Sequence, residues 1–408
     1  MLNRQIRGSS PPPRGGDGNH VWKLWATGLP QLHVQPLKQK QAYTIGSILQ
    51  HYISLWFSLL SPIQYAQKNG NGLKGLVDAG LETLPQQYVQ PPEERLDVSE
   101  LVSKESLPTI DVSNWDDPEV AKSICEAASK WGFFQIINHG LPIELLESMK
   151  SAVHGFFGLP NEERRKYWKG QSVSNTVFLT TSFSPQSEKV LEWKDSLNFH
   201  YKPGDNESSA SWPPVCKDQV LDYIKRAEFI IKRLLQVLLK SLDVEEIDKA
   251  KEYALMGSVF VNLNYYPHCL NPELTAGIGR HADLSTITLL LQDDIGGLYV
   301  RAPEGNGWIH VSPIDGALVV NIGDALQIMS NDRYRSVEHR AIPSRSRNRV
   351  SIPIFANPGL DASIGPLPEV LASGEKPIYR QLIYGDYLRY YLAKGHEGKK
   401  TIDFAKKG

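Results

Sequence analysis

The stretch "GRHADLSTITLLLQDDIGGLYV", residues Gly279 to Val300, decides which fold the chain is expected to adopt. His281 and Asp283 stand two positions apart in it, and a strand-like apolar run follows them. Two adjacent glycines then supply a turn before a second short apolar run. Taken alone, the His-x-Asp pair indicates either part of a metal site or two polar residues at the end of a strand. The sequence around it distinguishes the two.

Short apolar runs rich in β-branched residues continue on both sides of this stretch, from Met256 onward. They recur about every ten residues and are separated by Gly, Pro, Asn and Asp, which is typical of an all-β sandwich or barrel. The runs are "SVFVNLNYYP", "STITLLLQD", "GLYVR", "WIHVSP", "ALVVNIGD", "YRSVEHRAI" and "RVSIPIFANP". Helical spacing returns in "YRQLIYGDYLRYYLAKG". Residues 251–408 are therefore predicted to form a β-barrel core with a C-terminal helix.

Residues 69–250 show mostly helical spacing around one early core strand. Apolar residues recur at intervals of three and four in "DPEVAKSICEAASKWG", "PIELLESMKSAVHGFFGLP" and "KDQVLDYIKRAEFIIKRLLQVLLKSL". A short strand and turn is predicted in "LPTIDVSNW", and "FFQIINHG" predicts the buried strand. Since no long linker or repeat separates this part from the β-rich part, the helices are expected to pack outside the barrel. The predicted class is mainly β with flanking helices (α+β).

The composition is that of an ordinary globular protein, with 408 residues, 41% hydrophobic and 22% charged. A net charge of -1 provides no global attraction to nucleic acid or to an anionic membrane, so neither is an expected partner. The three cysteines are scattered and form no C-x-x-C pair. This excludes a disulfide framework and favours a reducing compartment.

Residues 1–68 differ in composition from the rest. Residues 1–70 contain seven lysines and arginines but one acidic residue, Asp17, and "SSPPPRGGDGNH" has almost nothing to bury. We expect a disordered or atypical extension. The apolar segment Ile45–Leu60 is shorter than the ~20 residues that a membrane span needs. The expected location is cytoplasmic, with plastid or other targeting by residues 1–68 as the alternative.

A third candidate metal ligand, His339, lies in "RYRSVEHR" on a later predicted strand. A jelly roll brings such distant strands side by side, next to His281 and Asp283. Two imidazoles and one carboxylate on one face of a metal leave three octahedral positions open, as in non-haem Fe(II) oxygenases. Zinc is more often given a third histidine or a cysteine. The pattern therefore favours iron.

A candidate anion site follows in "NRVSIPIF", where Arg349 and Ser351 alternate onto one face of a strand. A guanidinium binds a carboxylate through two parallel hydrogen bonds, and a neighbouring hydroxyl adds a third. A dicarboxylic co-substrate that chelates the iron at one end and pairs with Arg349 at the other fits both sites. Tyr266, in "NLNYYPHC", is placed to donate to the same carboxylates. Pairing of Arg349 with an internal Glu or Asp is the alternative.

With these residues in place, the sequence resembles the plant 2-oxoglutarate and Fe(II)-dependent dioxygenases. The family's motifs appear in order as "NYYP", H-x-D, the distal histidine and R-x-S, and the resemblance extends from about Asn69 to the C-terminus. Within the family, "NGLKGLVDAGLETLPQQYVQP", "DIGGLYVR", "NIGDALQIMSN", "YRSVEHR" and "GKKTIDFAK" are similar to the feruloyl-CoA ortho-hydroxylases. The resemblance implies that residues 251–408 form a double-stranded β-helix, or jelly-roll, core.

The chain is expected to be a monomer, and the resemblance also implies a function. Fe(II), 2-oxoglutarate and O2, with ascorbate in support, would hydroxylate the ring of feruloyl-CoA at the ortho (6') position, on the route to the coumarin scopoletin. The implied residues are the iron ligands His281, Asp283 and His339, the 2-oxoglutarate contacts Tyr266, Asn264, Arg349 and Ser351, and a substrate-stacking Phe355. A core position is the alternative for Phe355.

Two other functions stay open at this point. A related dioxygenase could hydroxylate a free coumarin, flavonoid or other specialised metabolite, and a non-catalytic jelly-roll protein could bind small molecules. The intact motifs argue against the second. Among the remaining histidines, His139 is expected to be a hydrogen-bonded turn residue, and His268, His310 and His396 are expected on the surface. "GNGLKG", Gly70–Gly75, is expected to be a flexible turn rather than a phosphate loop.

Overall fold

The computed structural model describes residues 71–407 except 103–104, 173, 183–187, 203–206, 208, 305–306, 373 and 397. The predictions for residues 1–68, including Ile45–Leu60, lie outside the described residues. None of the helices in the described part is both long enough and apolar enough to cross a membrane.

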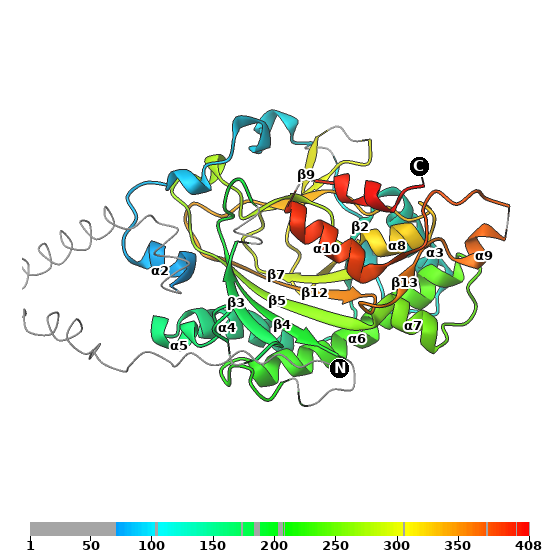
Figure 1. Cartoon of the computed structure of the whole chain (residues 1–408), viewed down its shortest axis with the longest axis horizontal. Helices are drawn as coiled ribbons and strands as arrows, with labels where there is room; N and C mark the ends of the chain where they lie inside the picture. The colour runs from blue at the N-terminus through cyan, green and yellow to red at the C-terminus, as the bar shows by residue number, and fades with distance from the viewer. Residues whose placement is uncertain are drawn as a thin grey trace, which may run out of the picture. The chain divides into compact units, whose positions relative to one another are not determined.

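The described part of the chain contains two large sheets with helices around them (Figure 1). Its helices are α2 (Gly72–Asp78), α3 (Pro118–Lys130), α4 (Ile143–Phe157), α5 (Asn161–Arg165), α6 (Lys217–Lys240), α7 (Lys249–Met256), α8 (Asp324–Met329), α9 (Pro368–Leu371) and α10 (Tyr384–Lys394).

The larger sheet has eight strands in the order β1-β2-β10-β7-β12-β5-β4-β3, and the smaller has four in the order β6-β11-β8-β9. The strands of the larger sheet are β1 (Thr109–Asp111), β2 (Phe133–Ile137), β10 (Leu318–Ile322), β7 (Ile287–Gln292), β12 (Arg349–Asn357), β5 (Ser258–Tyr266), β4 (Asp195–Tyr201) and β3 (Val177–Thr181). Those of the smaller are β6 (Ile278–His281), β11 (His339–Ala341), β8 (Leu298–Arg301) and β9 (Trp308–His310), and β13 (Ser363–Ile364) pairs with β14 (Leu382–Ile383). Except for β1 and β2, the paired strands are antiparallel, and the inner faces of both sheets enclose one cavity. This confirms the predicted jelly-roll core.

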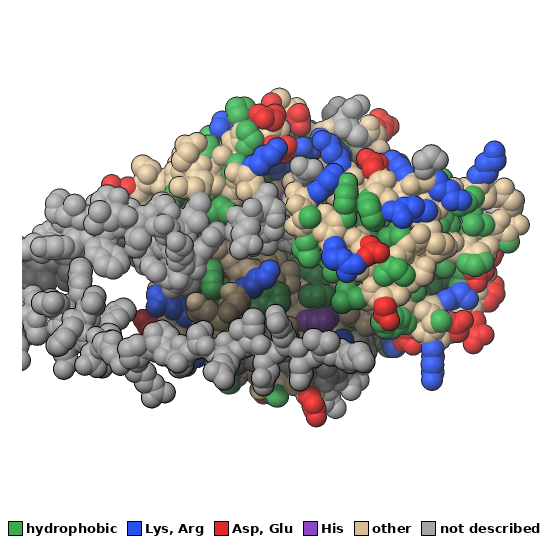
Figure 2. Space-filling view, in the orientation of Figure 1, with side chains coloured by type: hydrophobic (Ala, Val, Ile, Leu, Met, Phe, Trp, Pro, Cys, Tyr) green, Lys and Arg blue, Asp and Glu red, His purple; other side chains and the backbone are tan. Residues whose placement is uncertain are grey.

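Helices α4 and α6 cover the outer face of the larger sheet, below β5 and β12 in Figure 1. The apolar stripe of α6 recurs at three and four residues and is buried from Val220 to Leu239. Each fully buried Leu or Ile of such a stripe contributes about 1.5–3 kcal/mol. The helices therefore form one hydrophobic core with the sheet, as the sequence predicts. Basic, acidic and apolar side chains are intermixed on the coloured part of the face in Figure 2.

Two strands in the region predicted to be helical around one core strand were missed. β3 and β4 extend the larger sheet beyond β5. In β3, buried residues alternate with Phe178 and Thr180, which line the cavity together with Asn198 of β4. Thr180 and Asn198 are polar residues on the inner face of the sheet, where a core strand would have apolar ones. The alternation was therefore not recognised.

In the described part of the segment Gly70–Gly75, which was expected to be a flexible turn, helix α2 begins at Gly72. Its first turn donates two backbone hydrogen bonds to Asp195, from Leu73 N at 2.7 Å and Lys74 N at 2.8 Å. A helix N-terminus attracts negative charge. Here an internal carboxylate occupies that position, so the glycine pattern serves packing.

Candidate functional site

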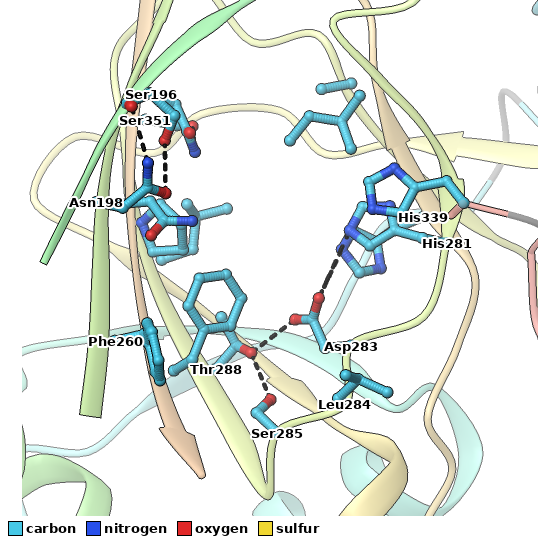
Figure 3. A pocket seen from close by; sticks show the side chains of 18 of the residues that line it. Ser196, Asn198, Phe260, His281, Asp283, Leu284, Ser285, Thr288, His339 and Ser351 are labelled. Atoms are coloured by element: carbon cyan, nitrogen blue, oxygen red, sulfur yellow. Dashed lines mark hydrogen bonds and ion pairs between the residues drawn. The ribbon is translucent and has the colours of Figure 1, made fainter. Parts of the chain in front are cut away.

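A cavity of about 350 Å³ lies between the inner faces of the two sheets, and residues of α10 also line it. Its smaller-sheet side carries His281 and His339, and its larger-sheet side carries Ser351 and Asn198 (Figure 3). The cavity therefore brings the predicted metal ligands and the predicted anion site into one space.

The three predicted iron ligands converge at one end of the cavity. His281 on β6 and His339 on β11 are directly opposite each other in neighbouring antiparallel strands, and Asp283 follows β6. Asp283 Oδ1 lies 3.5 Å from His281 Nε2 and 3.6 Å from His339 Nε2. The three ligand atoms all lie within 4.8 Å of one another. This donor set fits a metal that keeps part of its coordination sphere open.

Backbone carbonyls set the orientation of both imidazoles. His281 Nδ1 lies 2.9 Å from Gly279 O, and His339 Nδ1 lies 3.2 Å from Val337 O. A carbonyl can only accept, so each Nδ1 carries the proton and each Nε2 keeps a lone pair for a metal. Burial and the neighbouring His281 lower the pKa of His339 to about 4, which keeps this ring neutral.

The carboxylate of Asp283 is also oriented by its neighbours. Thr288 Oγ1 and Asn321 Nδ2 donate to Asp283 Oδ2 at 2.6 and 2.7 Å, and these two donors are directly opposite each other on β7 and β10. Oδ1 is left facing the histidines. Burial opposes ionisation, but the histidines and the Thr288 hydroxyl outweigh it and hold the pKa of Asp283 below its usual range. The residue therefore presents one charged oxygen.

The four residues predicted to bind 2-oxoglutarate lie together on β5 and β12. Arg349 is opposite Tyr266, and Ser351 is opposite Asn264. Ser351 Oγ lies 3.3 Å from Tyr266 OH and 3.4 Å from Asn264 Nδ2. Each of the four is at most 3% exposed. A guanidinium, two hydroxyls and an amide thus meet in a buried part of the cavity.

Arg349 has an unused donor. Its Nε donates to Gly296 O and its Nη2 to Gln292 Oε1 at 3.3 Å, whereas the buried Nη1 has no hydrogen-bond partner within residues 71–407 as described. No described carboxylate forms an ion pair with it, so the alternative of an internal Glu or Asp partner is not observed. A buried, unsatisfied charged donor costs free energy unless a ligand pairs with it. An anion fits this position.

Phe355 faces the cavity and is half-buried. It lies directly opposite Phe260 on β5 and Thr288 on β7. Phe260 also lines the cavity, and its outer neighbour His200 stacks on it with ring centroids 4.4 Å apart. Sequence reasoning found Phe355 but missed Phe260, because β5 was recognised as a strand without its neighbour β4. The pair forms an aromatic wall next to the residues that orient Asp283.

The segment "EWKD", Glu192–Asp195, was also missed. Counted with their backbone atoms, all four residues are at most 5% exposed. Trp193 Nε1 donates to Pro267 O at 2.9 Å, Lys194 lines the cavity, and Asp195 caps α2. Three charged residues around a tryptophan, just before an alternating strand, are the signal that could have revealed it.

The predicted surface position of His396 is wrong. Its side chain is 7% exposed, and its Nδ1 lies 2.6 Å from Glu192 Oε1. The error arises because its partner is far away in the sequence. His268 and His310 are exposed, as predicted.

Comparisons with known proteins agree with this geometry. A family model described as the 2OG-Fe(II) oxygenase superfamily matches residues 258–358, and one described as the N-terminal part of a non-haem dioxygenase in morphine synthesis matches residues 107–219. A crystal structure of JOX2 in complex with 2OG, Fe and JA is similar with a TM-score of 0.72 and 31% identity, covering 82% of this chain and 97% of JOX2.

Curated relatives match over a similar span. A bi-functional coumaroyl CoA and feruloyl CoA ortho-hydroxylase of Ipomoea batatas is 55% identical over 350 residues, which cover 86% of this chain and 98% of the relative. Feruloyl CoA ortho-hydroxylase 1 of Arabidopsis thaliana is 52% identical over 339 residues, 83% of this chain and 93% of the relative. The similarity thus extends over nearly the full length of each relative.

Proposed function

Because the chain belongs to the 2OG-Fe(II) oxygenase superfamily, and is therefore a dioxygenase that uses Fe(II) and 2-oxoglutarate, we propose that it hydroxylates the aromatic ring of feruloyl-CoA at the ortho (6') position. The observation that carries this proposal is the single cavity, which has a two-histidine, one-carboxylate cluster at one end and the open Nη1 of Arg349 at the other. The named activity of the relatives supplies the substrate.

In this proposal His281, Asp283 and His339 hold the iron. When bound, the metal and its co-substrate supply the O2-derived oxidant that places oxygen on the ring, with release of succinate and CO2. Arg349 and Ser351 hold the far carboxylate of 2-oxoglutarate, with Tyr266 and Asn264 completing the contacts. The protein's own task is to orient both reactants and to keep water out.

The aromatic wall suits a planar substrate ring. Phe260 and Phe355 lie opposite each other on neighbouring strands and both line the cavity, and Thr288, the partner of Phe355 on β7, donates a hydrogen bond to Asp283. A ring stacked on this wall would therefore lie next to the metal ligands. Stacked aromatic pairs gain about 0.5–1.5 kcal/mol beyond the burial of their area.

The edge of the larger sheet suits the charged arm of an acyl-CoA. Phe178 of β3, the last strand of the sheet, lines the cavity opposite Asn198. Lys169 lies exposed at this edge, with Nζ 5.7 Å from the Phe178 ring centroid. It forms no ion pair with any carboxylate of the described residues. An ammonium group at the rim of the cavity is thus available to a phosphate group.

The relative named for both substrates favours p-coumaroyl-CoA as a second substrate. Both proposed substrates are tested by incubating the purified full chain with Fe(II), 2-oxoglutarate, ascorbate and either feruloyl-CoA or p-coumaroyl-CoA. We expect the ortho-hydroxylated product and an equal amount of succinate. Free ferulate, a free coumarin and a flavonoid, which lack the CoA thioester, are assayed in parallel for comparison. Turnover of one of these in place of the thioesters would contradict the proposal.

A further inference from the structure

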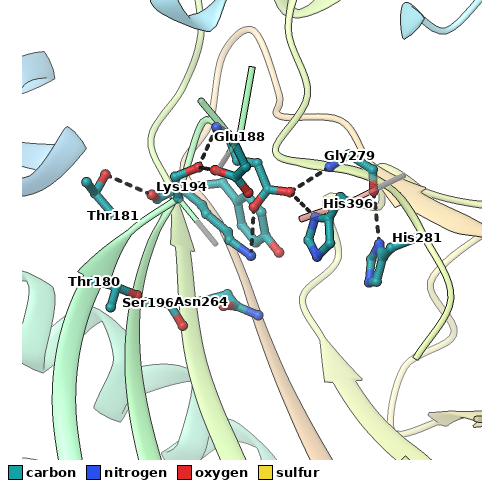
Figure 4. A network of polar contacts seen from close by, with 12 residues as sticks. Thr180, Thr181, Glu188, Lys194, Ser196, Asn264, Gly279, His281 and His396 are labelled. Atoms are coloured by element: carbon teal, nitrogen blue, oxygen red, sulfur yellow. Dashed lines mark hydrogen bonds and ion pairs between the residues drawn. The ribbon is translucent and has the colours of Figure 1, made fainter. Parts of the chain in front are cut away.

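A buried ionic network lies directly behind the metal ligand His281 (Figure 4). It joins three segments that are distant in the sequence: Glu192 and Lys194 before β4, Gly279 on β6, and His396 after α10. The side chains of Glu192, Lys194 and His396 are 3%, 6% and 7% exposed. Burying ionised groups costs several kcal/mol for each ion unless they are paired. These groups can therefore be buried here only because they pair with one another.

Glu192 is the centre of this network. Its Oε1 accepts from Gly279 N at 2.9 Å and lies 2.6 Å from His396 Nδ1, while its Oε2 lies 3.2 Å from Lys194 Nζ. Burial opposes ionisation of Glu192, but Lys194 and His396 outweigh it and keep the pKa of this carboxyl below its usual range. One carboxylate thus holds a backbone amide, an imidazole and an ammonium in place.

Two of these partners contact the iron ligand. Gly279, whose N–H donates to Glu192, accepts the Nδ1 hydrogen of His281 on its carbonyl at 2.9 Å. The ring of His396 stacks on the ring of His281 with centroids 4.5 Å apart and planes 17° apart. Glu192 therefore acts on His281 both through the backbone of β6 and through a stacked ring.

The C-terminal segment is also bonded to the free edge of β6. Gly398 N donates to Arg280 O at 2.9 Å, and His281 forms an isolated parallel bridge with Gly398. On its other edge, His281 pairs with His339. The strand that carries the first iron ligand is thus held between the second ligand and the C-terminal segment.

We propose that Glu192 and His396 are positioning residues for the metal centre, through which the C-terminal segment sets the orientation of His281. This rests on the proposed iron-binding role of His281. Residues that orient a ligand in this way commonly change metal affinity about 10- to 100-fold when they are replaced. Lys194 balances the charge of Glu192 and lines the cavity beside the co-substrate residues.

The test is Mn(II) affinity together with the visible absorption spectrum of the Co(II)-loaded full chain. His396→Ala removes both the stacked ring and the hydrogen bond, and we expect a Kd for Mn(II) raised about 10- to 100-fold and a shifted Co(II) spectrum. His396→Phe keeps a stacked ring and is expected to fall between His396→Ala and the parent. His154→Ala, an exposed histidine on α4, is the matched control.

A double variant tests Glu192. Glu192→Gln alone leaves Lys194 buried and unpaired, so we combine it with Lys194→Met to remove both charges. We expect weaker Mn(II) binding and the same direction of spectral change. The surface pair Glu163→Gln with Lys166→Met is its control, since these side chains are ion-paired but exposed.

The outcomes separate the two proposals. If the parent binds no metal, the proposed function fails. If the parent binds metal and the folded variants, checked by near-UV circular dichroism, match its Kd and Co(II) spectrum, only the positioning role is overturned. Should His396→Ala not fold, His396→Phe and the double variant decide by the same two measurements.

Discussion

Two clusters of ligand-type side chains lie side by side around β6, and they differ in where their charges are balanced. In each, the ligand atoms lie within 4.8 Å of one another. They consist of His281, Asp283 and His339, and of Glu188, Glu192 and His396. In the first cluster, Nδ1 of each histidine and Oδ2 of the aspartate form hydrogen bonds with the protein. The two Nε2 atoms and Oδ1 are left facing one another. In the second, Lys194 already supplies the cation. Ligand-type residues form a metal site only when such atoms stay open.

The largest effect is expected from the open cluster. His339→Ala should reduce bound metal from one equivalent to none and abolish hydroxylation, because it removes one of three protein ligands. Metal analysis of the dialysed protein measures this. The parent should bind one equivalent, since Lys194 repels a cation from the second cluster. Two equivalents in the parent, or one in His339→Ala, would break the comparison.

Arg349 and Lys194 differ in the same way, because Arg349 has a buried donor without a hydrogen-bond partner among the described residues, whereas Lys194 is paired with Glu192. Arg349→Leu should raise the KM for 2-oxoglutarate at least about 30-fold, because truncating one partner of a buried charge pair costs about 2 kcal/mol or more. Arg349→Lys keeps the charge but loses the forked geometry and should have a smaller effect. Succinate release at varied 2-oxoglutarate measures both. Arg347→Leu, at an exposed ion pair with Asp294, should leave the KM unchanged.

Lys169 is open as well, but it is exposed. Lys169→Ala should raise the KM for feruloyl-CoA by up to about fivefold, since exposed ion pairs contribute about 0.2–1 kcal/mol. The KM for a truncated feruloyl thioester without phosphates should not change. Lys166→Ala, which removes a neighbouring surface lysine that pairs with Glu163, is the control. Equal effects on both thioesters would show that Lys169 does not contact the phosphates.

Both ring nitrogens of His139 are hydrogen-bonded within the protein, so replacing this residue should change stability and not metal binding. Leu141 N donates to its Nδ1 at 3.2 Å, and its Nε2 donates to Gly316 O at 2.8 Å, which confirms the predicted turn histidine. Burial lowers its pKa, so below the ordinary histidine pKa of ~6.5 the unfolded state binds more protons and the free energy of unfolding falls. The free energy of unfolding of His139→Gln should therefore decrease slightly less than that of the parent when the pH is lowered from ~7.5 to ~5.5. Urea denaturation at the two pH values measures this. An unchanged pH dependence would contradict it.

Local sequence patterns predicted Arg349 and Ser351, which face the cavity, better than the residues of β3 and β4 that also line it. Arg349 and Ser351 alternate onto one face of a strand, and this period of two is visible in the sequence. The apolar stripe of α6 is visible in the same way. Thr180 and Asn198 carried no such signal, because β3 and β4 turn these polar residues toward the cavity rather than toward solvent.

The sequence by itself determined the residue types and their local spacing: His-x-Asp ahead of an apolar strand, a distal histidine, Arg-x-Ser, and a β-rich second half. Only the tertiary structure decided which atoms stay open. Glu192 and His396 are 204 positions apart, yet they share a hydrogen bond behind His281. The physical reason is that burial and pairing are set by strands and segments that meet only in the folded chain, whereas periodicity is set by neighbours along it.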